Sequence, residues 1–351
     1  MIKINTAWYL TNYSCNNKCL WCYAGSAISK NVFKEKTSFK NAKKAVDFLS
    51  MIDVKRCILL GGESTLLPYL SRLIKYGSDK NIEMGLVTNG IRTKDENYLK
   101  ELFTAGLPHI TFSLEGHTAQ LHDYVTQNKG SFKSLLSSID NCKSNDFSFS
   151  TLSTISSITA PFAKEIAAFS NNIGSKIATF NLCSPSIAKD NLDFVLPPVV
   201  LARIIEELGI FVVENKLKSK VITPLPKCVF NKKIATLLEK HGFLSKSRGC
   251  QIFSGNALVV DFNGDVLPCS HWSNLSLFNI AEVKSKKQFE IKMEKGIGLK
   301  LRKSIWRYPS YKCMHCPEWG KTCVGGCPLL WLKYNPSKEL DFINNRSKSY
   351  E

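Results

Sequence analysis

Three cysteines near the start of the chain have a spacing that suits iron chemistry. Cys15, Cys19 and Cys22 directly follow the apolar segment 7–13, which predicts a β-strand. Three thiolates on one loop can hold three irons of a [4Fe–4S] cluster and leave the fourth iron open to a substrate. Zinc is the alternative. It usually takes two Cys-x2-Cys pairs, and this group has no obvious fourth partner nearby.

A second group of cysteines lies in the last third of the chain. Its members are Cys228, Cys250, Cys269, Cys313, Cys316, Cys323 and Cys327. A reducing compartment disfavours disulfides, and the grouping favours metal or cluster ligands. A zinc ribbon stays open as an alternative, because Cys-x2-Cys is also its signature. Cys57 and Cys142 fall inside a predicted strand and a predicted helix, where packing explains a cysteine.

The elements that must position these cysteines alternate between strand and helix from residue 6 to about 215. The predicted strands are 7–13, 55–60, 83–88, 109–114, 148–155 and 177–183. The predicted helices are 41–51, 67–77, 96–105, 131–142, 162–171 and 199–213. This series predicts an α/β fold with a parallel sheet, open or curled into a barrel, whose ligands bind at the carboxyl ends of the strands.

The strand–helix rhythm breaks near residues 224–226, where the chain becomes rich in Cys, Gly and Pro. We therefore expect two domains, 1–215 and a cysteine-rich 216–351. Within the second, Asn263-Gly264 predicts a β-hairpin, because Asn-Gly is a strong two-residue turn.

The composition is that of a globular protein with an excess of positive charge. The chain has 351 residues, of which 44% are hydrophobic, and its net charge is +18. No signal peptide and no apolar run of membrane-spanning length occurs, so we expect a cytoplasmic protein with no membrane partner. The basic residues are scattered and carry no nucleic-acid-binding signature, so nucleic acid is not an expected partner. Solvated faces or an acidic partner would account for the charge.

Taken in order, the motifs resemble those of the radical S-adenosylmethionine (SAM) superfamily. Its hallmark is C-x3-C-x-aromatic-C after the first strand of a partial (β/α)6 barrel, and Trp21 fills the aromatic position. Three further motifs follow predicted strands: Gly61-Gly62-Glu63, Thr88-Asn89-Gly90 and Ser113-Leu114-Glu115-Gly116, the last with Glu115 where the family has Asp.

The resemblance implies a SAM site. Its residues would be Trp21, Tyr23, Gly61, Gly62, Glu63, Thr88, Asn89, Ser113 and Glu115. Glycines permit close backbone approach, and Glu63 offers an anionic acceptor for the SAM ammonium group. For Asn89 and Ser113, ordinary turn chemistry is the alternative.

The resemblance also implies the chemistry. A reduced cluster on Cys15, Cys19 and Cys22 would cleave SAM to methionine and a 5′-deoxyadenosyl radical, which abstracts hydrogen from an unreactive C–H bond. The protein would supply orientation and exclude water. A flavodoxin- or ferredoxin-type protein would supply the electron.

The C-terminal cysteines resemble the SPASM domain, an extension of many radical SAM enzymes that carries two auxiliary [4Fe–4S] clusters and so brings the total to three. The resemblance assigns one auxiliary cluster to Cys228, Cys250, Cys269 and Cys327. It assigns the other to Cys313, Cys316 and Cys323, with the fourth ligand open between Asp341, His315 and an uncovered iron. The chain departs from the family pattern in one spacer, and it has no cysteine after Cys327.

SPASM-bearing enzymes mostly modify ribosomally made peptides or proteins. The resemblance therefore implies a peptide maturase, an oxidoreductase that installs a thioether or carbon–carbon crosslink, and an acidic leader on the peptide would suit the basic surface. The alternatives are a dehydrogenase or epimerase of a small molecule such as a sugar alcohol, formylglycine formation as in sulfatase maturases, and a non-catalytic cluster or zinc scaffold.

Cys183, at the end of a predicted strand, is a candidate hydrogen donor, with packing as its alternative. Few residues precede the first strand, so a leader would need a partner protein or an edge strand.

Overall fold

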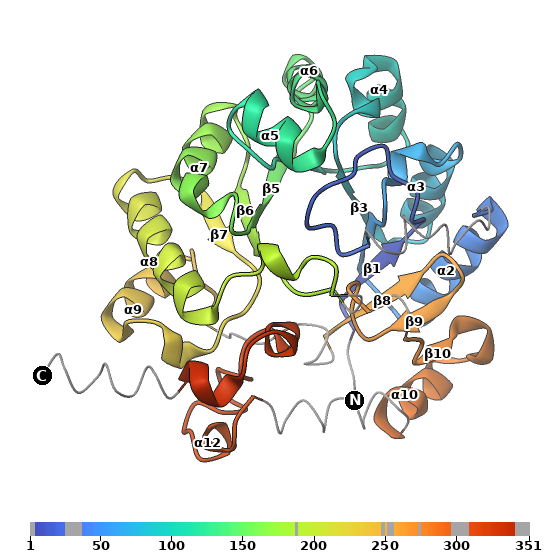
Figure 1. Cartoon of the computed structure of the whole chain (residues 1–351). Helices are drawn as coiled ribbons and strands as arrows, with labels where there is room; N and C mark the ends of the chain where they lie inside the picture. Colours follow the sequence, from blue (N-terminus) through green and yellow to red (C-terminus); the bar gives the residue numbers. More distant parts are fainter. Residues whose placement is uncertain are drawn as a thin grey trace, which may run out of the picture. The chain divides into compact units, whose positions relative to one another are not determined.

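The computed structural model of the chain describes residues 4–24, 37–186, 189–246, 250, 256–272, 275–295 and 309–340. Figure 1 shows the chain with its helices and strands labelled. The chain divides into two compact units. Unit 1 comprises Met1–Thr151 and Gln251–Lys300, and unit 2 comprises Leu152–Cys250 and Leu301–Glu351. The expected domains 1–215 and 216–351 stay a prediction. Within the described ranges, no helix combines the length and the apolar character that a membrane crossing needs.

Unit 1 is built on a sheet whose central strands are parallel. Its strands are β1 (Thr6–Leu10), β2 (Arg56–Leu60), β3 (Glu83–Thr88), β4 (Ile110–Ser113), β8 (Ala257–Asp261), β9 (Asp265–Leu267) and β10 (Phe278–Asn279). They lie in the order β10-β9-β8-β1-β2-β3-β4. Strand β1 is parallel to both β2 and β8, with Trp8 opposite Ile58 and Val259. Because parallel strands end at the same edge, the loops that follow β1 to β4 meet there.

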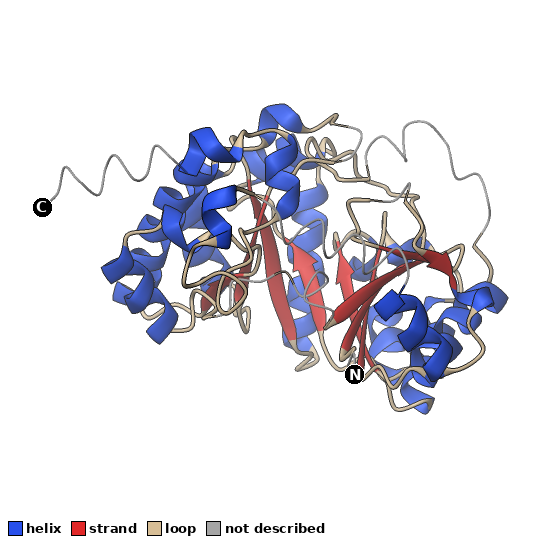
Figure 2. Ribbon diagram, turned by 90° about the horizontal axis from the view of Figure 1, so that it is seen from below, coloured by secondary structure: helices blue, strands red, loops and turns tan. Residues whose placement is uncertain are grey.

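Helices pack around this sheet (Figure 2), and their buried residues are mostly apolar. They are α2 (Phe39–Met51), α3 (Leu70–Asp79), α4 (Glu96–Thr104), α5 (Ala119–Thr126), α6 (Ser131–Ser144) and α10 (Lys286–Lys295), with the 3-10 turns η1 (Ser64–Leu66), η2 (Arg92–Lys94) and η6 (Ile280–Glu282). Tyr9, Leu59 and Phe112 point into the core and are almost fully buried. Helix α2 begins where the Ser38 hydroxyl accepts a hydrogen bond from the Asn41 N–H, which is the usual helix N-cap.

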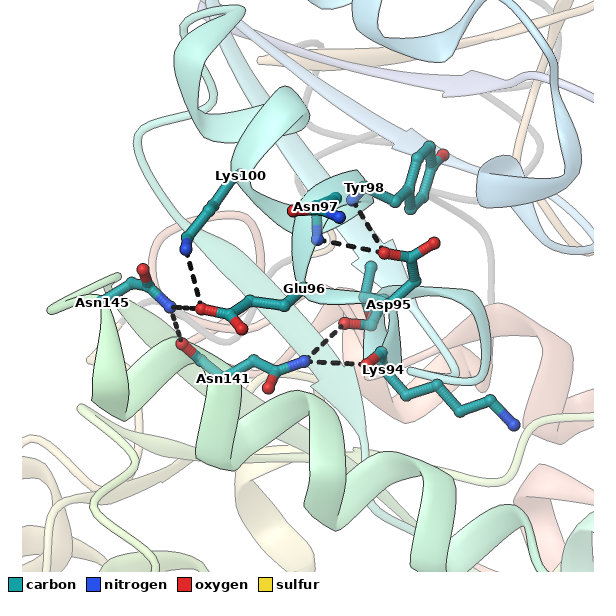
Figure 3. Close-up of polar contacts among 9 residues, drawn as sticks. Lys94, Asp95, Glu96, Asn97, Tyr98, Lys100, Asn141 and Asn145 are labelled. Atoms are coloured by element: carbon teal, nitrogen blue, oxygen red, sulfur yellow. Dashed lines mark hydrogen bonds and ion pairs between the residues drawn. The ribbon is translucent and has the colours of Figure 1, made fainter.

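Polar side chains fix the start of α4 against α6 (Figure 3). The Asp95 carboxylate caps α4 by accepting from the Asn97 N–H at 3.0 Å. The Asn141 side chain of α6 donates to the Lys94 carbonyl at 2.9 Å. These bonds orient two helices that follow β3 and β4, the strands whose ends carry several predicted site residues.

Unit 2 continues the alternation of strand and helix. Strands β6 (Ala178–Leu182) and β7 (Ser219–Val221) are parallel, and β5 (Phe149–Ile155) crosses the division between the units. The helices are α7 (Ala163–Asn172), α8 (Pro198–Glu214), α9 (Lys232–Lys240) and α12 (Tyr311–Met314), with the 3-10 turns η3 (Ala160–Phe162), η4 (Leu192–Phe194), η5 (Lys227–Val229) and η7 (Pro328–Leu332). A hollow of about 500 Å³ between α7 and α8 is lined by none of the predicted site residues.

The predicted α/β class is confirmed, and the predicted strands and helices are all present with ends shifted by a few residues. The Asn-Gly hairpin is confirmed as well, since β8 and β9 are antiparallel and Gly264 has a φ of +84°. The pairing of β8 with β1 was not predicted. Local patterns specify a strand but not a partner far away in the sequence. Helix α5 was also not predicted, because it is short and its apolar pattern is weak.

Candidate active site

The three N-terminal cysteines lie on the loop that follows β1, at the carboxyl edge of the sheet. Cys15, Cys19 and Cys22 are all partly buried. The Cys22 N–H donates to the Cys19 carbonyl at 3.1 Å and closes a turn between them. The Asn17 N–H donates to Cys15 Sγ at 3.4 Å. A backbone donor of this kind stabilises a thiolate that ligates iron.

Two glycines allow the loop after β2 to pack directly against the cysteine loop. The Gly62 N–H donates to the Asn12 carbonyl at 2.8 Å, and the Glu63 N–H donates to the Ser14 carbonyl at 2.7 Å. A Cβ on Gly62 would lie 2.2 Å from the Ser14 carbonyl oxygen, and one on Gly61 would lie 2.3 Å from that of Asn12. Both positions therefore need glycine to hold the cysteine loop. Their contact with SAM stays a prediction.

The Glu63 carboxylate is buried, with 1% of the residue exposed, and both of its oxygens accept hydrogen bonds. Oε1 accepts from the Thr65 N–H at 3.0 Å and from the hydroxyls of Thr65 and Thr88 at 2.7 Å each. Oε2 accepts from the Asn89 N–H at 2.8 Å. Oε1 thus accepts three of the four bonds, whereas Oε2 accepts one and keeps a lone pair. In this arrangement Glu63 joins the end of β3 to the loop after β2, and its contact with the SAM ammonium group stays a prediction.

Asn89 connects the end of β3 to the cysteine loop. Its Nδ2 donates to Asn16 Oδ1 at 2.7 Å and lies 3.9 Å from Cys15 Sγ. Its Oδ1 accepts from the Ile91 N–H at 3.0 Å, as a turn asparagine does. The same side chain thus serves the turn and holds the candidate cluster loop.

The remaining predicted cofactor residues also lie at this edge. Thr88 ends β3 and Ser113 ends β4. Glu115 is buried, and its carboxylate is close enough to Cys19 to raise the pKa of that thiol. These are the positions that the resemblance implied, and their contact with SAM stays a prediction.

The end of α5 also holds the cysteine loop. The Lys18 N–H donates to the Thr126 carbonyl and the Leu20 N–H donates to the Val125 carbonyl, both at 3.0 Å. The Asn128 side chain donates to the loop as well. These residues were not predicted individually.

His122 and Asp123 stabilise this part of α5. His122 Nδ1 accepts from the Glu115 N–H at 3.2 Å, and burial lowers the pKa of the ring to about 4. Burial opposes ionisation of Asp123, but the N–H donors of Phe132 and Gly130 outweigh it and lower its pKa. The Asp123 carboxylate accepts from them at 2.8 and 2.6 Å and so fixes the start of α6 to α5.

Burial disfavours the charged form of two thiols on the cysteine loop, those of Cys15 and Cys19. Burial raises the pKa of Cys15 to about 11, and the nearby Glu63 carboxylate and Cys22 thiol add to the shift. Burial also raises the pKa of Cys19 well above its usual value, with contributions from Glu115, Cys22 and Cys15. The three thiols are therefore close enough to act on one another. A metal that binds them must displace their protons.

Two aromatic residues accompany the cysteines. Trp21 is buried, and the Tyr23 hydroxyl donates to the Gly61 carbonyl at 3.3 Å. The Tyr23 ring centroid lies 4.8 Å from that of His271, whose Nδ1 is 3.7 Å from Cys269 Sγ. Burial raises the pKa of Tyr23, and nearby thiols, that of Cys269 among them, add to it. Cys269, an implied auxiliary ligand, thus lies near the N-terminal cysteine loop within unit 1.

In unit 2, Cys327 lies beside Ser184, which follows the end of β6. The hydroxyl of Ser184 is 3.7 Å from Cys327 Sγ. Burial raises the pKa of Cys327 to about 11, and the thiol of Cys250 adds to it, so these two implied ligands are neighbours. Cys183 exposes only 3% of its surface, which is what packing requires, and its role as a hydrogen donor stays a prediction. Ser184 was not predicted, since nothing in its sequence neighbourhood distinguishes it.

The donor set at the N-terminal loop fits an iron–sulfur cluster. It offers three mutually close sulfurs, a backbone N–H donor to sulfur and partial burial. Within the described residues, no three His, Cys, Asp or Glu side chains are arranged to hold one metal ion. A [4Fe–4S] cluster is a larger body than a single ion, and its thiolate ligands are spread around it.

Comparison with known proteins finds a family match over the N-terminal part of the chain. Residues 9–159 match the model of the Radical SAM superfamily. The AdoMet-dependent heme synthase of Methanosarcina barkeri is 27% identical over 278 residues, which are 76% of this chain and 76% of the relative. The mycofactocin maturase MftC of Mycobacterium ulcerans is 26% identical over 148 residues, 42% of this chain and 38% of the relative.

The fold has solved counterparts. Streptococcus suis SuiB, solved with its precursor peptide SuiA, superposes with a TM-score of 0.73 over 96% of this chain and 74% of that chain, at 15% identity. This likeness extends beyond the matched segment, and the cysteine-rich C-terminal part is consistent with a SPASM domain. The matched segment contains the whole cysteine loop and the motifs after β2, β3 and β4, and the family implies SAM and a [4Fe–4S] cluster. Residues 9–159 of the chain therefore carry a Radical SAM domain.

Proposed function

We propose that this radical SAM enzyme modifies a ribosomally made peptide by abstracting a hydrogen atom from one of its residues. The observation that supports this proposal most directly is a loop of three thiols at the carboxyl edge of the sheet. Hydrogen bonds from the loops after β2 and β3 and from the end of α5 hold this loop in place. A mycofactocin maturase among the sequence relatives, and a fold like that of SuiB with its precursor peptide, support a peptide as the substrate. The net charge of +18 would attract an acidic leader segment.

Cys15, Cys19 and Cys22 would hold the SAM-binding cluster, and the C-terminal cysteines would hold auxiliary clusters. When bound, these clusters supply the electron that cleaves SAM and an acceptor for the electron that the substrate loses. A flavodoxin- or ferredoxin-type protein would deliver that first electron.

The chain's own residues would bind and orient SAM. Glu63 Oε2, which accepts one hydrogen bond, and the backbone carbonyls of the Gly61–Glu63 turn would be the acceptors there for the SAM ammonium group. Buried Trp21 would exclude water beside the cysteines.

A small molecule is the second candidate substrate. It is favoured by the match to an AdoMet-dependent heme synthase over 76% of this chain. In that case the same SAM chemistry would act on a porphyrin carboxylic acid or a molecule of similar class.

The two candidates are separated by one anaerobic experiment. The reconstituted enzyme is incubated with SAM, a reductant and either the precursor peptide encoded beside its gene or a porphyrin carboxylic acid. The proposal predicts 5′-deoxyadenosine formation and a peptide that loses about two mass units. Consumption of the porphyrin with an unchanged peptide would support the second candidate. A Cys22→Ala variant is the control for cluster-independent products, and no SAM cleavage by the wild type would contradict both.

A further inference from the structure

Cys313, Cys316 and Cys323 are brought together by a reversal of the chain in unit 2, which we call the three-cysteine turn. The Cys316 N–H donates to the Cys313 carbonyl at 3.2 Å, and the Cys323 N–H donates to the Glu318 carbonyl at 3.1 Å. The Gly320 N–H donates back to the Cys323 carbonyl at 2.9 Å. Burial raises the pKa of Cys313, and the thiols of Cys323 and Cys316 add to it, so the three side chains are neighbours.

The segment that precedes α9 is bonded to this turn. The Lys227 ammonium lies 3.3 Å from the Glu318 carboxylate, and Glu318 stands inside the turn. A little further along, the Cys327 N–H donates to the Pro224 carbonyl at 2.8 Å. One ion pair and one backbone bond therefore fix residues 224–227 against the chain from 318 to 327.

Cys228 follows this anchored segment directly, in the 3-10 turn η5. The residue is exposed, yet enough protein surrounds its thiol to raise the pKa to about 12, and the three thiols of the three-cysteine turn add to that shift. The thiol of Cys228 therefore lies within electrostatic reach of all three cysteines of the turn.

Cys327 belongs to a different neighbourhood. Its sulfur is 3.7 Å from the Ser184 hydroxyl at the end of β6, and the thiol that acts on it is that of Cys250. The cysteines of unit 2 thus separate into two groups, Cys228 with the three-cysteine turn and Cys250 with Cys327.

We propose that Cys228 is the fourth thiolate ligand of a [4Fe–4S] cluster held by the three-cysteine turn. This inference rests on the proposed auxiliary clusters and specifies the ligands of one of them. It moves Cys228 out of the set with Cys250, Cys269 and Cys327 that the SPASM resemblance implied. It also supplies the fourth cysteine ligand of this cluster, which residues 328–351 cannot supply because they contain no cysteine.

The chemistry of the site suits a cluster with four thiolates. The Lys227 cation, held beside the site by Glu318, offsets part of its negative charge. A zinc ribbon takes two close pairs of cysteines, whereas here only Cys313 and Cys316 form a close pair.

The test counts iron in the full chain, anaerobically reconstituted, with Mössbauer and EPR spectra of each variant. Cys228→Ala and Cys316→Ala should each remove about four irons per chain or leave a three-iron cluster in the same spectral component. The double variant Cys228→Ala/Cys316→Ala should lose no more than Cys316→Ala alone. Cys228→Ala/Cys250→Ala should lose about twice as much.

The opposite pattern, in which Cys228→Ala adds to Cys316→Ala but not to Cys250→Ala, would overturn the assignment. Loss of one zinc in place of iron would overturn it too. Cys142→Ala, a buried cysteine on α6, is the matched control and should keep all its iron. Cys228→Ser guards against misfolding, because it should retain the cluster with one oxygen-ligated iron visible by Mössbauer spectroscopy. None of these measurements needs a peptide or SAM turnover, so their failure is distinguishable from failure of the proposed function.

Discussion

Asn89 Nδ2 donates to Asn16 Oδ1 at 2.7 Å, and this bond ties the end of β3 to the loop of the N-terminal cysteines. The same nitrogen lies 3.9 Å from Cys15 Sγ. A side chain on one strand therefore sets the position of the candidate cluster ligands on the loop of another.

Asn89→Asp should weaken retention of the SAM-binding cluster. A carboxylate cannot donate to Asn16 Oδ1, and its charge would repel the Cys15 thiolate. The bond is part-buried, so its loss costs about 1 kcal/mol, and we expect the rate of 5′-deoxyadenosine formation to fall roughly fivefold or more. Asn97→Asp, on the exposed start of α4, is the matched control. Wild-type iron content and SAM cleavage in Asn89→Asp would show that the bond is dispensable.

Gly62→Ala should abolish retention of the same cluster. The new Cβ would lie 2.2 Å from the Ser14 carbonyl oxygen, so the cysteine loop would have to move. Gly130→Ala is the control, since no atom lies within 4 Å of its new Cβ and only its φ of +86° is unfavourable. It should cost about 1 kcal/mol of stability and leave the iron content unchanged. Equal iron content in both variants would show that glycine at position 62 is not needed to hold the cysteine loop.

The strand ends at one edge could be predicted from the sequence, because alternation and turn residues mark where each strand stops. The cysteine loop after β1 and the motifs after β2, β3 and β4 all lie at that edge, as expected. What Glu63 does there could not be predicted. A carboxylate after a strand can receive a ligand or tie two loops together, and the donors with which Glu63 ties its loop to β3 come from residues 25 and 26 positions away in the sequence.

Contacts between segments that are far apart in the sequence could not be predicted either. Strand β8 pairs with β1 across more than half of the chain, and Lys227 meets Glu318 across a gap of 91 residues. Such pairings depend on how whole elements pack, which no local pattern encodes. The resemblance to the SPASM domain therefore grouped Cys228 with Cys250, Cys269 and Cys327. The thiols that lie near Cys228 instead support its assignment to the three-cysteine turn.

His122 should make stability depend on pH between about 6.5 and 4. Its pKa falls from near 6.5 in the unfolded chain to about 4 in the fold, because burial disfavours the charged ring. Its contribution is therefore complete above pH 6.5 and is lost as the pH falls toward 4. The shift corresponds to about 3 kcal/mol. Chemical denaturation of the apoprotein should show this slope in the wild type and a shallower one in His122→Gln. Parallel pH profiles would show that His122 does not bind the proton.

Ser184→Ala should lower the reduction potential of the cluster that Cys327 ligates. The Ser184 hydroxyl lies 3.7 Å from the sulfur and also 3.3 Å from the Leu182 carbonyl, and a metal-bound thiolate is the stronger acceptor of the two. Such a donor stabilises the more negative, reduced cluster. Removing a bond of about 1 kcal/mol shifts a one-electron potential by on the order of 40 mV. EPR-monitored redox titration would measure it, with exposed Ser157→Ala as the control. A potential equal to that of the wild type would mean that the hydroxyl stays on Leu182 and that Cys327 is tuned by other groups.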